Sequence, residues 1–390
     1  MARRQHSPQE IAIVGGSAAG LFTAYLLARA GREVRVFEGQ DRLDSAPRTL
    51  IVTDGMRETL GGLGEKAVVN EIRQFELFTD GRVAKIALRR PDLVIERSAL
   101  INELAGAARS AGSAVEFGRK LLSLHGQNHS LTLTMDRSHG GGTEEAQFRT
   151  VIGADGAVSR VAQAAGWPKP RTVPLVQTIV NLPPGMPPGT VRVWFIPDDT
   201  PYFYWLIPHS PTQGVVGLIG EDGSATRPVL ERFLEKHRLM PLMYQGARIP
   251  VYTGWNPVRR RLTGGDVYLV GDAAGHVKVT TVGGIVTGFR GAVGVTEAIL
   301  NGGSSHKLRA LRRELDVHLL IRKVLHGFKQ ADYSLLVDLL NARARKDLEA
   351  HTRDEPSSLL FRICLHQPRL LLLGLRALLT GGTLLRQNLS

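Results

Sequence analysis

The sequence predicts an α/β fold in which a mainly parallel sheet is interleaved with an antiparallel sheet and followed by a helical carboxyl-terminal region. Three observations predict it. Three apolar runs each end in a turn of small residues that leads into a helix. Strand-like runs separated by Pro, Gly and Asp turns fill residues 172–254, and a helical pattern continues beyond Gly303. With 390 residues, the chain is long enough for two domains.

The first apolar run, at residues 11–14, is continuous and rich in β-branched side chains, as expected of a strand buried on both faces. Residues 15–20 read G-G-S-A-A-G, residues 21–30 have the pattern of a helix, and residues 33–37 form a second strand that ends at Glu38. A strand, a glycine-rich turn, a helix and a second strand in this order predict a Rossmann-like unit that binds a dinucleotide.

The turn of this unit is expected to hold the ADP half of the dinucleotide. Gly15 permits the tight turn, Gly20 lets the helix lie close to the strand, and the helix amino terminus offers N–H groups to a pyrophosphate. Ser17 replaces the second glycine of the usual fingerprint and is small enough to fit. Glu38 lies 23 residues after Gly15, where a carboxylate can accept both ribose hydroxyls and repel a 2′-phosphate. The predicted binding residues of this unit are Gly15, Gly16, Ser17, Ala18, Ala19, Gly20 and Glu38.

Two later segments repeat the pattern of an apolar strand followed by an acid among small residues. Residues 151–160 carry Asp155, and residues 267–275 carry Asp272. Such an aspartate can approach a sugar or ribitol hydroxyl, and a helix N-cap is its alternative role. Two glycines then open a predicted helix that runs to Ala298, and its N–H groups favour negative charge on a bound ring. The predicted binding residues of these segments are Asp155, Gly271, Asp272, Gly283, Gly284 and Ile285.

These segments, in this order, resemble the FAD-binding motifs of the class A flavoprotein monooxygenase and geranylgeranyl reductase superfamily. Residues 96–104 also look like the R-x-x-L helix start of that superfamily. The resemblance implies that FAD is bound non-covalently, with Arg97 near its phosphates, Asp272 beside the ribitol chain and the two glycines beside the ring. Arg48 stands where relatives place an arginine near the flavin, with a surface charge as the alternative. Asp155 is expected to shape its loop rather than to react.

The segment GDAAGHVKVTTVGGI at residues 271–285 is most similar to the geranylgeranyl reductase branch. Val279 and Val282 depart from that branch's pattern, which has proline and glycine at these places. Residues 202–208, Y-F-Y-W-L-I-P, resemble an aromatic strand that lies over the flavin in these reductases. They also resemble the W-x-W-x-I-P motif of flavin-dependent halogenases, with Phe203 in place of the first tryptophan.

Three residues of this region are the catalytic candidates. Aromatic residues that alternate along a strand are commonly core residues, but the resemblance implies that Tyr204 or Trp205 faces the substrate. Tyr204 and His209 are the candidate proton donors, although a lone histidine more often has a structural role.

The resemblance implies an FAD-dependent oxidoreductase that reduces C=C bonds of an isoprenoid or other hydrophobic substrate by hydride transfer from flavin N5. The alternatives are a monooxygenase (hydroxylase or epoxidase) or a halogenase acting through a C4a-hydroperoxide and, from another class, a flavin-binding protein without turnover. The sequence has no second glycine fingerprint flanked by a strand and a helix, so the electron donor is expected to be transiently bound NAD(P)H or a ferredoxin.

The domains are expected to interleave along the chain. Residues 9–75, 95–170 and 255–302 are assigned to the FAD-binding domain, residues 76–94 and 171–254 to an antiparallel substrate-binding sheet, and residues 303–390 to the helical region. The glycine-rich stretch at residues 139–142 is expected to be a hairpin tip in the FAD-binding domain.

Composition limits the class of protein. Hydrophobic residues make up 43% of the chain and charged residues 22%, which is ordinary for a soluble globular protein. No apolar run approaches the ~18 residues of a membrane span. The first ten residues lack the apolar stretch of a secretory signal, so a cytoplasmic location is expected. Cys364 is the only cysteine, which excludes an intramolecular disulfide and a four-cysteine metal site, and no metal is expected.

The net charge of +13 is high, and it fits a solvated basic surface, an anionic membrane face or a polyanionic ligand. Nucleic acid is not expected, because no basic stretch interleaved with aromatic residues occurs. Arg362, Arg369 and Arg376 are seven residues apart, which would place them on one side of a helix. Pro368 would begin that helix or break it. The terminal helix is expected to dock on the substrate domain or to lie peripherally in a membrane interface.

Overall fold

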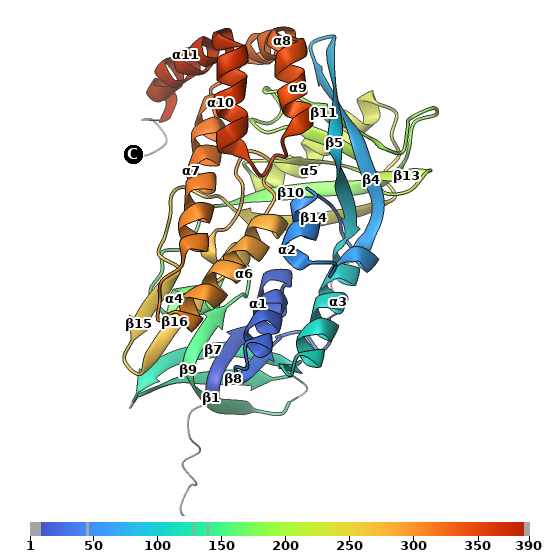
Figure 1. The fold of residues 1–390 in the computed structure, drawn as a ribbon. Coiled ribbons are helices and arrows are strands. Elements are labelled where there is room, and N and C mark those ends of the chain that lie inside the picture. The colour runs from blue at the N-terminus through green and yellow to red at the C-terminus, as the bar shows by residue number, and fades with distance from the viewer. Residues whose placement is uncertain (1–8, 44–46, 128, 139, 386–390) are drawn as a thin grey trace, which may run out of the picture.

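The computed structural model describes residues 9–43, 47–127, 129–138 and 140–385. Two eight-stranded sheets form its framework. In Figure 1 the first sheet lies at the lower end of the molecule, the second sheet lies in the upper half, and the carboxyl-terminal helices stand at the upper left. The predicted α/β class, with a nucleotide-binding sheet, a second sheet and terminal helices, is confirmed.

The first sheet has a parallel centre. Its order is β15 (Arg259–Leu262), β16 (Gly265–Leu269), β9 (Thr143–Gly153), β1 (Gln9–Val14), β2 (Val34–Phe37) and β6 (Ala114–Glu116). β7 (Arg119–Gln127) and β8 (Ser130–Arg137) extend it as antiparallel strands next to β9. Val14 pairs with Gly153, which pairs with Leu269. The carboxyl ends of three strands that are remote in sequence therefore meet at one edge.

Both faces of this sheet are covered, as its continuous apolar strands predict. Ile11 and Ile13 pack with α1 (Ala18–Arg29), α3 (Arg97–Ser110) and α6 (Ile285–Leu300), which lie in front of the sheet in Figure 1. The alternate residues Ala12 and Val14 pack with strands β7 and β8 and with α4 (Arg160–Ala164). The hairpin expected around residues 139–142 joins β8 to β9, although residue 139 itself lies outside the described residues.

The second sheet has the order β14 (Met243–Pro250), β10 (Thr172–Asn181), β13 (Gln213–Ile219), β12 (Tyr204–Pro208), β11 (Thr190–Trp194), β4 (Val68–Thr79), β5 (Arg82–Glu96) and β3 (Thr49–Val52). It is antiparallel except where β11 pairs in parallel with β4. The expected domain boundary at residue 75 falls inside β4, because β4 pairs with β5 along its whole length. Residues 49–52, assigned to the first domain, also lie in this sheet.

One helix lies inside the stretch that was expected to contain only strands. α5 (Gly223–Lys236) begins where the side chain of Asp222 accepts a hydrogen bond from the backbone N–H of Ser224. Leu230 and Phe233 are buried against the second sheet. Pro228 and the small residues around it are typical of a turn in the sequence, and burial of the apolar face outweighs that local preference.

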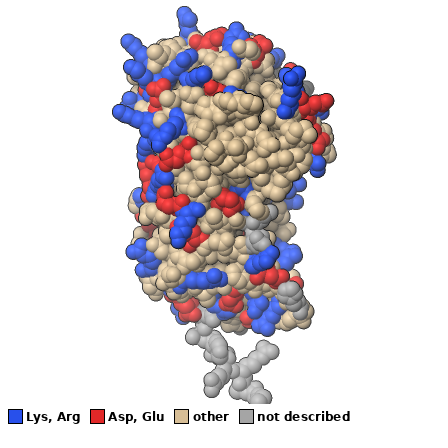
Figure 2. Space-filling view, turned by 90° about the vertical axis from the view of Figure 1, so that its right-hand side faces the viewer, with Lys and Arg blue, Asp and Glu red and all other residues tan. Residues whose placement is uncertain are grey.

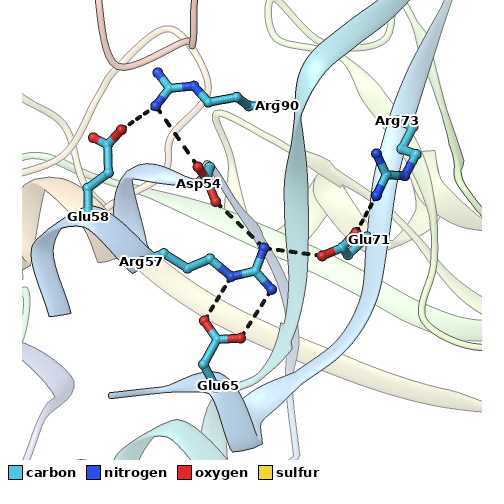
Figure 3. A network of polar contacts seen from close by, with 7 residues as sticks. All are labelled: Asp54, Arg57, Glu58, Glu65, Glu71, Arg73 and Arg90. Atoms are coloured by element: carbon cyan, nitrogen blue, oxygen red, sulfur yellow. Dashed lines mark hydrogen bonds and ion pairs between the residues drawn. The ribbon is translucent and has the colours of Figure 1, made fainter. Parts of the chain in front are cut away.

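A surface network of ion pairs connects the segment at residues 54–65 with β4 and β5 of the second sheet (Figure 3). Arg57, on α2 (Gly55–Leu60), donates hydrogen bonds to Glu65, 2.8 Å and 3.1 Å long, and to Glu71 on β4, 3.1 Å long. Arg90 on β5 pairs with Glu58. These groups are partly exposed, and such pairs typically contribute at most ~1 kcal/mol each. The side of the molecule drawn in Figure 2 carries both signs of charge below and a broad area without charges in its upper half.

Beyond residue 303 the described chain is helical, as expected. The helices are α7 (His306–His326), α8 (Gln330–Leu339), α9 (Ala342–Ala350), α10 (Pro356–His366) and α11 (Pro368–Leu385). α7 runs along the left side of Figure 1 from the first sheet toward the other four. Within the part of the chain that the structure describes, no single helix is long and apolar enough to span a membrane, and α10 and α11 pass that test only together, across a 110° bend.

That bend corrects one expectation. Pro368 is the first residue of α11, where the missing N–H costs nothing but where the chain cannot continue the preceding helix. Arg362 therefore lies on α10, and only Arg369 and Arg376 share a helix.

Candidate functional site

The glycine-rich turn after β1 lies against the turn after β9. Gly15 has a φ of +106°, and a Cβ placed there would lie 2.5 Å from the carbonyl oxygen of Ala154. A Cβ on Gly20 would lie 2.5 Å from the carbonyl oxygen of Gly15. Ser17 caps α1, since its hydroxyl accepts a hydrogen bond of 3.2 Å from the backbone N–H of Gly20. The two glycines thus let the helix amino terminus approach the strand edge, as the sequence predicts.

Glu38 lies at the end of β2, beside this turn. Its carboxylate accepts hydrogen bonds from the backbone N–H groups of Gly16, at 2.7 Å, and Gln40, at 2.9 Å. Glu38 and the glycine-rich turn line a cavity of about 380 Å³. Arg97 and Asp155 line it too, so several of the segments predicted to bind the cofactor surround one space.

The same cavity contains residues that the sequence did not single out. They are Leu43, Ile101, Arg119, Lys120 and Leu121. Arg119 and Lys120 begin a strand, and a strand end with two basic residues is too common a pattern to predict a nucleotide contact.

Asp155 organises the turn after β9. Its carboxylate accepts hydrogen bonds from the Ser159 hydroxyl at 2.5 Å and from the backbone N–H groups of Arg160 at 2.7 Å and Val161 at 3.2 Å. Burial raises the pKa of Asp155, and these hydrogen bonds oppose that rise. Each of these bonds holds the start of α4, in agreement with the expected role of shaping the loop.

Three charged residues from separate segments, Arg48, Arg97 and Asp272, lie close enough to affect one another's pKa. Arg48 is half-buried, and its buried Nε has no hydrogen-bond partner among the described residues. Burial and the neighbouring Arg97 lower the pKa of Arg48 to about 10, against the opposing effect of Asp272. Burial raises the pKa of Asp272, and the two arginines lower it. A half-buried guanidinium with an unpaired Nε beside a carboxylate matches the phosphates and hydroxyls of a dinucleotide.

The loop between β16 and α6 adopts the conformation of a glycine-rich loop although it contains valine. Val282 has a φ of +53°, the left-handed region that β-branched residues rarely adopt. This is the position where the reductase pattern has glycine. Gly284 precedes α6, and a Cβ there would lie 2.9 Å from Oδ1 of Asp272. The missing Cβ of Gly284 therefore lets the start of α6 lie directly beside Asp272.

A second cavity, of about 320 Å³, lies between this loop and the second sheet. Its walls are mostly apolar and include Leu50, Val193, Trp205, Ile207 and residues 280–283. Trp205 is 7% exposed, and its Nε1 has no partner among the described residues. The Phe203 ring lies 6.1 Å from the Trp205 ring. The cavity can hold an apolar molecule next to the amino terminus of α6.

The family model of the FAD binding domain matches residues 9–303. The chain belongs to this FAD-binding domain family. It is 25% identical over 369 residues to digeranylgeranylglycerophospholipid reductase 2 of Methanothermobacter thermautotrophicus, covering 86% of this chain and 92% of that protein. It is 26% identical over 341 residues to geranylgeranyl diphosphate reductase of Rhodobacter capsulatus, covering 82% and 83%.

Solved structures share the fold. A geranylgeranyl bacteriochlorophyll reductase-like protein from Thermoplasma acidophilum has a TM-score of 0.75 at 18% identity, covering 92% of this chain and 96% of that one. A flavin-dependent brominase has a TM-score of 0.66 at 13% identity, covering 92% and 99%. The chain is therefore an FAD-dependent oxidoreductase that is distantly homologous to isoprenoid reductases.

Two catalytic candidates lie away from the apolar cavity of this flavoprotein. Tyr204 points to the opposite face of the sheet, where its ring stacks on Phe233 at 4.0 Å and its hydroxyl donates to Asp199 at 2.9 Å. Burial and Asp199 raise its pKa. His209 follows β12 and its N–H donates to the Gln213 carbonyl. Since neighbouring strand residues face opposite sides, Trp205 alone of the three lines the cavity.

A buried ion pair that the sequence did not indicate holds the loop between β16 and α6, residues 270–284, which we call the flavin loop. Lys278, on this loop, pairs with Asp354, which precedes α10, and their side chains are 7% and 1% exposed. Asp354 also accepts a hydrogen bond from Thr53. Burial would raise the pKa of Asp354, but Lys278, Thr53 and Arg290 together hold it at about 2. The partners are 76 residues apart, so no local pattern could have predicted the pair.

His276, on the same loop, is fully buried. Its ring stacks on Trp255, with centroids 5.7 Å apart and planes 20° from parallel. Neither ring nitrogen has a partner among the described residues, and burial lowers its pKa to about 4. Burial therefore favours the neutral imidazole at pH 7.

Proposed function

We propose that this FAD-dependent oxidoreductase reduces carbon–carbon double bonds of an isoprenoid chain or a similar hydrophobic substrate. The observation that carries the proposal is the apolar cavity between residues 280–283 and the second sheet, with Trp205 in its wall. Both named relatives are reductases of geranylgeranyl compounds. An unactivated double bond has no polar group that the protein could hydrogen-bond. Apolar side chains in the cavity wall must therefore orient it.

FAD would be held along the edge where the strands of the first sheet end. Ser17 and the α1 amino terminus would face the pyrophosphate and Glu38 the adenosine ribose. Arg48 and Arg97 would neutralise phosphate charge, and Asp272 would accept from the ribitol chain. When bound in its reduced form, FAD supplies the hydride.

The chain's own residues would orient the substrate, exclude water and provide the proton. Trp205, Phe203 and Ile207 would hold the alkene against the loop at residues 280–283. Hydride adds to one alkene carbon and a proton to the other, which leaves the flavin oxidised and in need of an external reductant. We propose that the phenol of Tyr202 donates this proton. Tyr202 lines the cavity, and burial raises its pKa, which keeps the phenol protonated.

The positive charge of Arg322, next to Tyr202, favours loss of the phenol proton. The Arg322 guanidinium lies 3.9 Å from the centroid of the Tyr202 ring, and its charge lowers the phenol pKa against the effect of burial. A phenolate formed during proton transfer would be stabilised by that charge. Tyr202 thus takes the role expected for Tyr204.

Single-turnover reaction under anaerobic conditions tests the proposal. Purified protein is loaded with FAD, reduced with dithionite and mixed with a geranylgeranyl lipid, and the product is examined by mass spectrometry. We expect the flavin to reoxidise as the lipid gains two hydrogens per turnover. An oxygen or halogen atom in the product, formed only when O₂ is admitted, would replace the reductase assignment by a monooxygenase or halogenase.

Tyr202→Phe gives a second, narrower test. We expect it to lower the rate of alkene reduction at least tenfold while FAD affinity stays unchanged. Tyr204→Phe is the matched control, since its phenol faces α5. Equal rates for Tyr202→Phe and the unchanged protein would remove Tyr202 from the mechanism.

A further inference from the structure

α11 is apolar on two sides, and the described residues of the protein cover only one of them. Leu373 and Ala377 are buried in a cluster with Phe328 and Tyr333. Five leucines on the other side are between 36% and 81% exposed: Leu371, Leu372, Leu375, Leu378 and Leu379. A helix that is apolar all round is normally buried all round, so the exposed leucines indicate a second apolar partner.

The preceding helix adds to the same kind of surface. On α10, Phe361 is 71% exposed and Leu365 is 65% exposed. We call the seven exposed apolar residues of α10 and α11 the terminal apolar face. α10 and α11 stand at one end of the molecule, far from the first sheet (Figure 1).

Positive charge borders this face. At roughly 100° per residue the exposed leucines of α11 cover an arc of about 120°, and Arg369 and Arg376 lie roughly 40–60° beyond one edge of it. Both arginines are exposed, as is Arg362 on α10. The sequence from residue 357 onward contains no acid. Arginines at the rim of an apolar stripe can reach anionic headgroups while their methylene groups follow the apolar surface.

A further cavity lies between the terminal apolar face and the cavity that contains Trp205. It has a volume of about 450 Å³ and is lined mainly by leucine, isoleucine and valine from α7, α10 and α11. Leu371, Leu375 and Leu378 line it and are also exposed, so the cavity opens on the face. It shares Thr280, Thr281, Leu325 and Arg353 with the cavity that contains Trp205. The two cavities are therefore adjacent, and together they extend from the exposed leucines to the loop at residues 280–283.

We propose that the terminal apolar face docks on a bilayer that carries anionic lipid, and that the apolar substrate chain enters through the cavity behind it. The docking stands on the exposed leucines and the arginine rim alone, whereas the access route rests on the proposed function. A second copy of this chain fits the face less well. In a two-fold dimer the surface would meet itself, and two arginine rims would oppose each other without acids from residues 357–390.

Vesicle flotation of the full-length, FAD-loaded protein tests the docking. The vesicles are phosphatidylcholine alone or phosphatidylcholine with one-third phosphatidylglycerol, at low salt. We expect at least tenfold more protein on the anionic vesicles, and a large reduction on raising the salt to 0.5 M, because surface charges are screened. The double variant Leu372→Glu, Leu379→Glu should lower binding to anionic vesicles at least tenfold.

The matched control carries Met240→Glu and Leu242→Glu, which introduce the same two charges at residues 76% and 52% exposed outside the terminal apolar face. It should bind vesicles like the unchanged protein, and all variants should retain stoichiometric FAD, which shows that they fold. Absence of the unchanged protein from anionic vesicles would overturn the docking. Equal binding by the double variant would overturn the assignment to this face. A dimer of the unchanged protein that the double variant converts to monomer, without vesicle binding, would assign the face to a second copy.

Turnover separates the access route from the proposed function. The double variant should reduce a vesicle-embedded geranylgeranyl lipid at least tenfold more slowly than the unchanged protein, and a detergent-dissolved short prenyl substrate at an equal rate. Equal rates on the embedded lipid would overturn the access route. If the unchanged protein reduced neither substrate, the proposed function would be refuted, whereas the conclusion from flotation about membrane docking would not be affected.

Discussion

Breaking the buried pair between Lys278 and Asp354 should destabilise the protein far more than breaking a surface pair. Lys278→Met removes the cation and leaves the Asp354 carboxylate buried, with the Thr53 hydroxyl still donating to it. Loss of one member of a buried pair typically costs ~3–5 kcal/mol, because the remaining charge is uncompensated. The pKa of about 2 for Asp354, against ~3.9 in an unfolded chain, corresponds to about 2–3 kcal/mol at neutral pH. The two figures agree in magnitude.

The sign of the pH dependence follows from the lowered pKa. The folded state holds the Asp354 proton less tightly than the unfolded state, so this stabilisation is complete above the unfolded pKa. It is lost as pH falls from about 5 toward 2, where the folded carboxyl also becomes protonated. The double variant Lys278→Met, Asp354→Leu has neither charge and should lack this part of the acid sensitivity.

Urea denaturation followed by circular dichroism and tryptophan fluorescence measures the free energy of unfolding for each variant. We expect Lys278→Met to lose ~3–5 kcal/mol and the double variant to lose clearly less, because no charge remains unpaired. Arg73→Met is the matched control, because Arg73 makes one exposed pair, with Glu71, in the network of Figure 3, and it should lose no more than ~1 kcal/mol. A double variant as unstable as Lys278→Met, or an Arg73→Met loss of equal size, would refute the reasoning.

Three further predictions concern the cofactor and the cavity. Gly15→Ala should abolish FAD binding measured by flavin fluorescence. The alanine Cβ would lie 2.5 Å from the Ala154 carbonyl oxygen, and the backbone there has a φ of +106°. Normal affinity would show that the turn can relax. Glu38→Ala should weaken FAD binding at least tenfold in titration, because it removes the ribose acceptor and the hydrogen bond from the backbone N–H of Gly16. Unchanged affinity would show that the adenosine ribose does not bind at Glu38. Tyr204→Phe should lower the free energy of unfolding by ~1–2 kcal/mol, because it removes the hydrogen bond to Asp199, and it should leave kcat unchanged. A lower kcat would show that Tyr204 takes part in catalysis.

Local sequence patterns were sufficient to predict the nucleotide-binding edge. Gly15, Glu38, Asp155 and Asp272 each follow a short apolar strand, and parallel strands of one sheet end at a common edge. Their meeting therefore follows once the strands are recognised. The departure at Val282 was also visible in the sequence, although only the backbone showed that valine adopts the left-handed conformation there.

The orientation of the aromatic strand β12 could not be predicted from the sequence. Alternation places Tyr204 and Trp205 on opposite faces of any strand, but it does not say which face meets the flavin loop. That was decided by α5, which covers the Tyr204 face, and α5 itself was missed because its first residues are typical of a turn. The domain boundary inside β4 was missed for a related reason, since pairing between β4 and β5 is a property of the sheet.

The sequence by itself determined the cofactor class and the fold, because strand, turn and helix signals act over a few residues and are written next to one another. Only the tertiary structure decided the Lys278–Asp354 pair, the cavity wall around Trp205 and the break between α10 and α11. Each of these depends on burial and on contacts between segments remote in the chain. The free energy that selects them comes from packing and desolvation, which no short stretch of sequence contains.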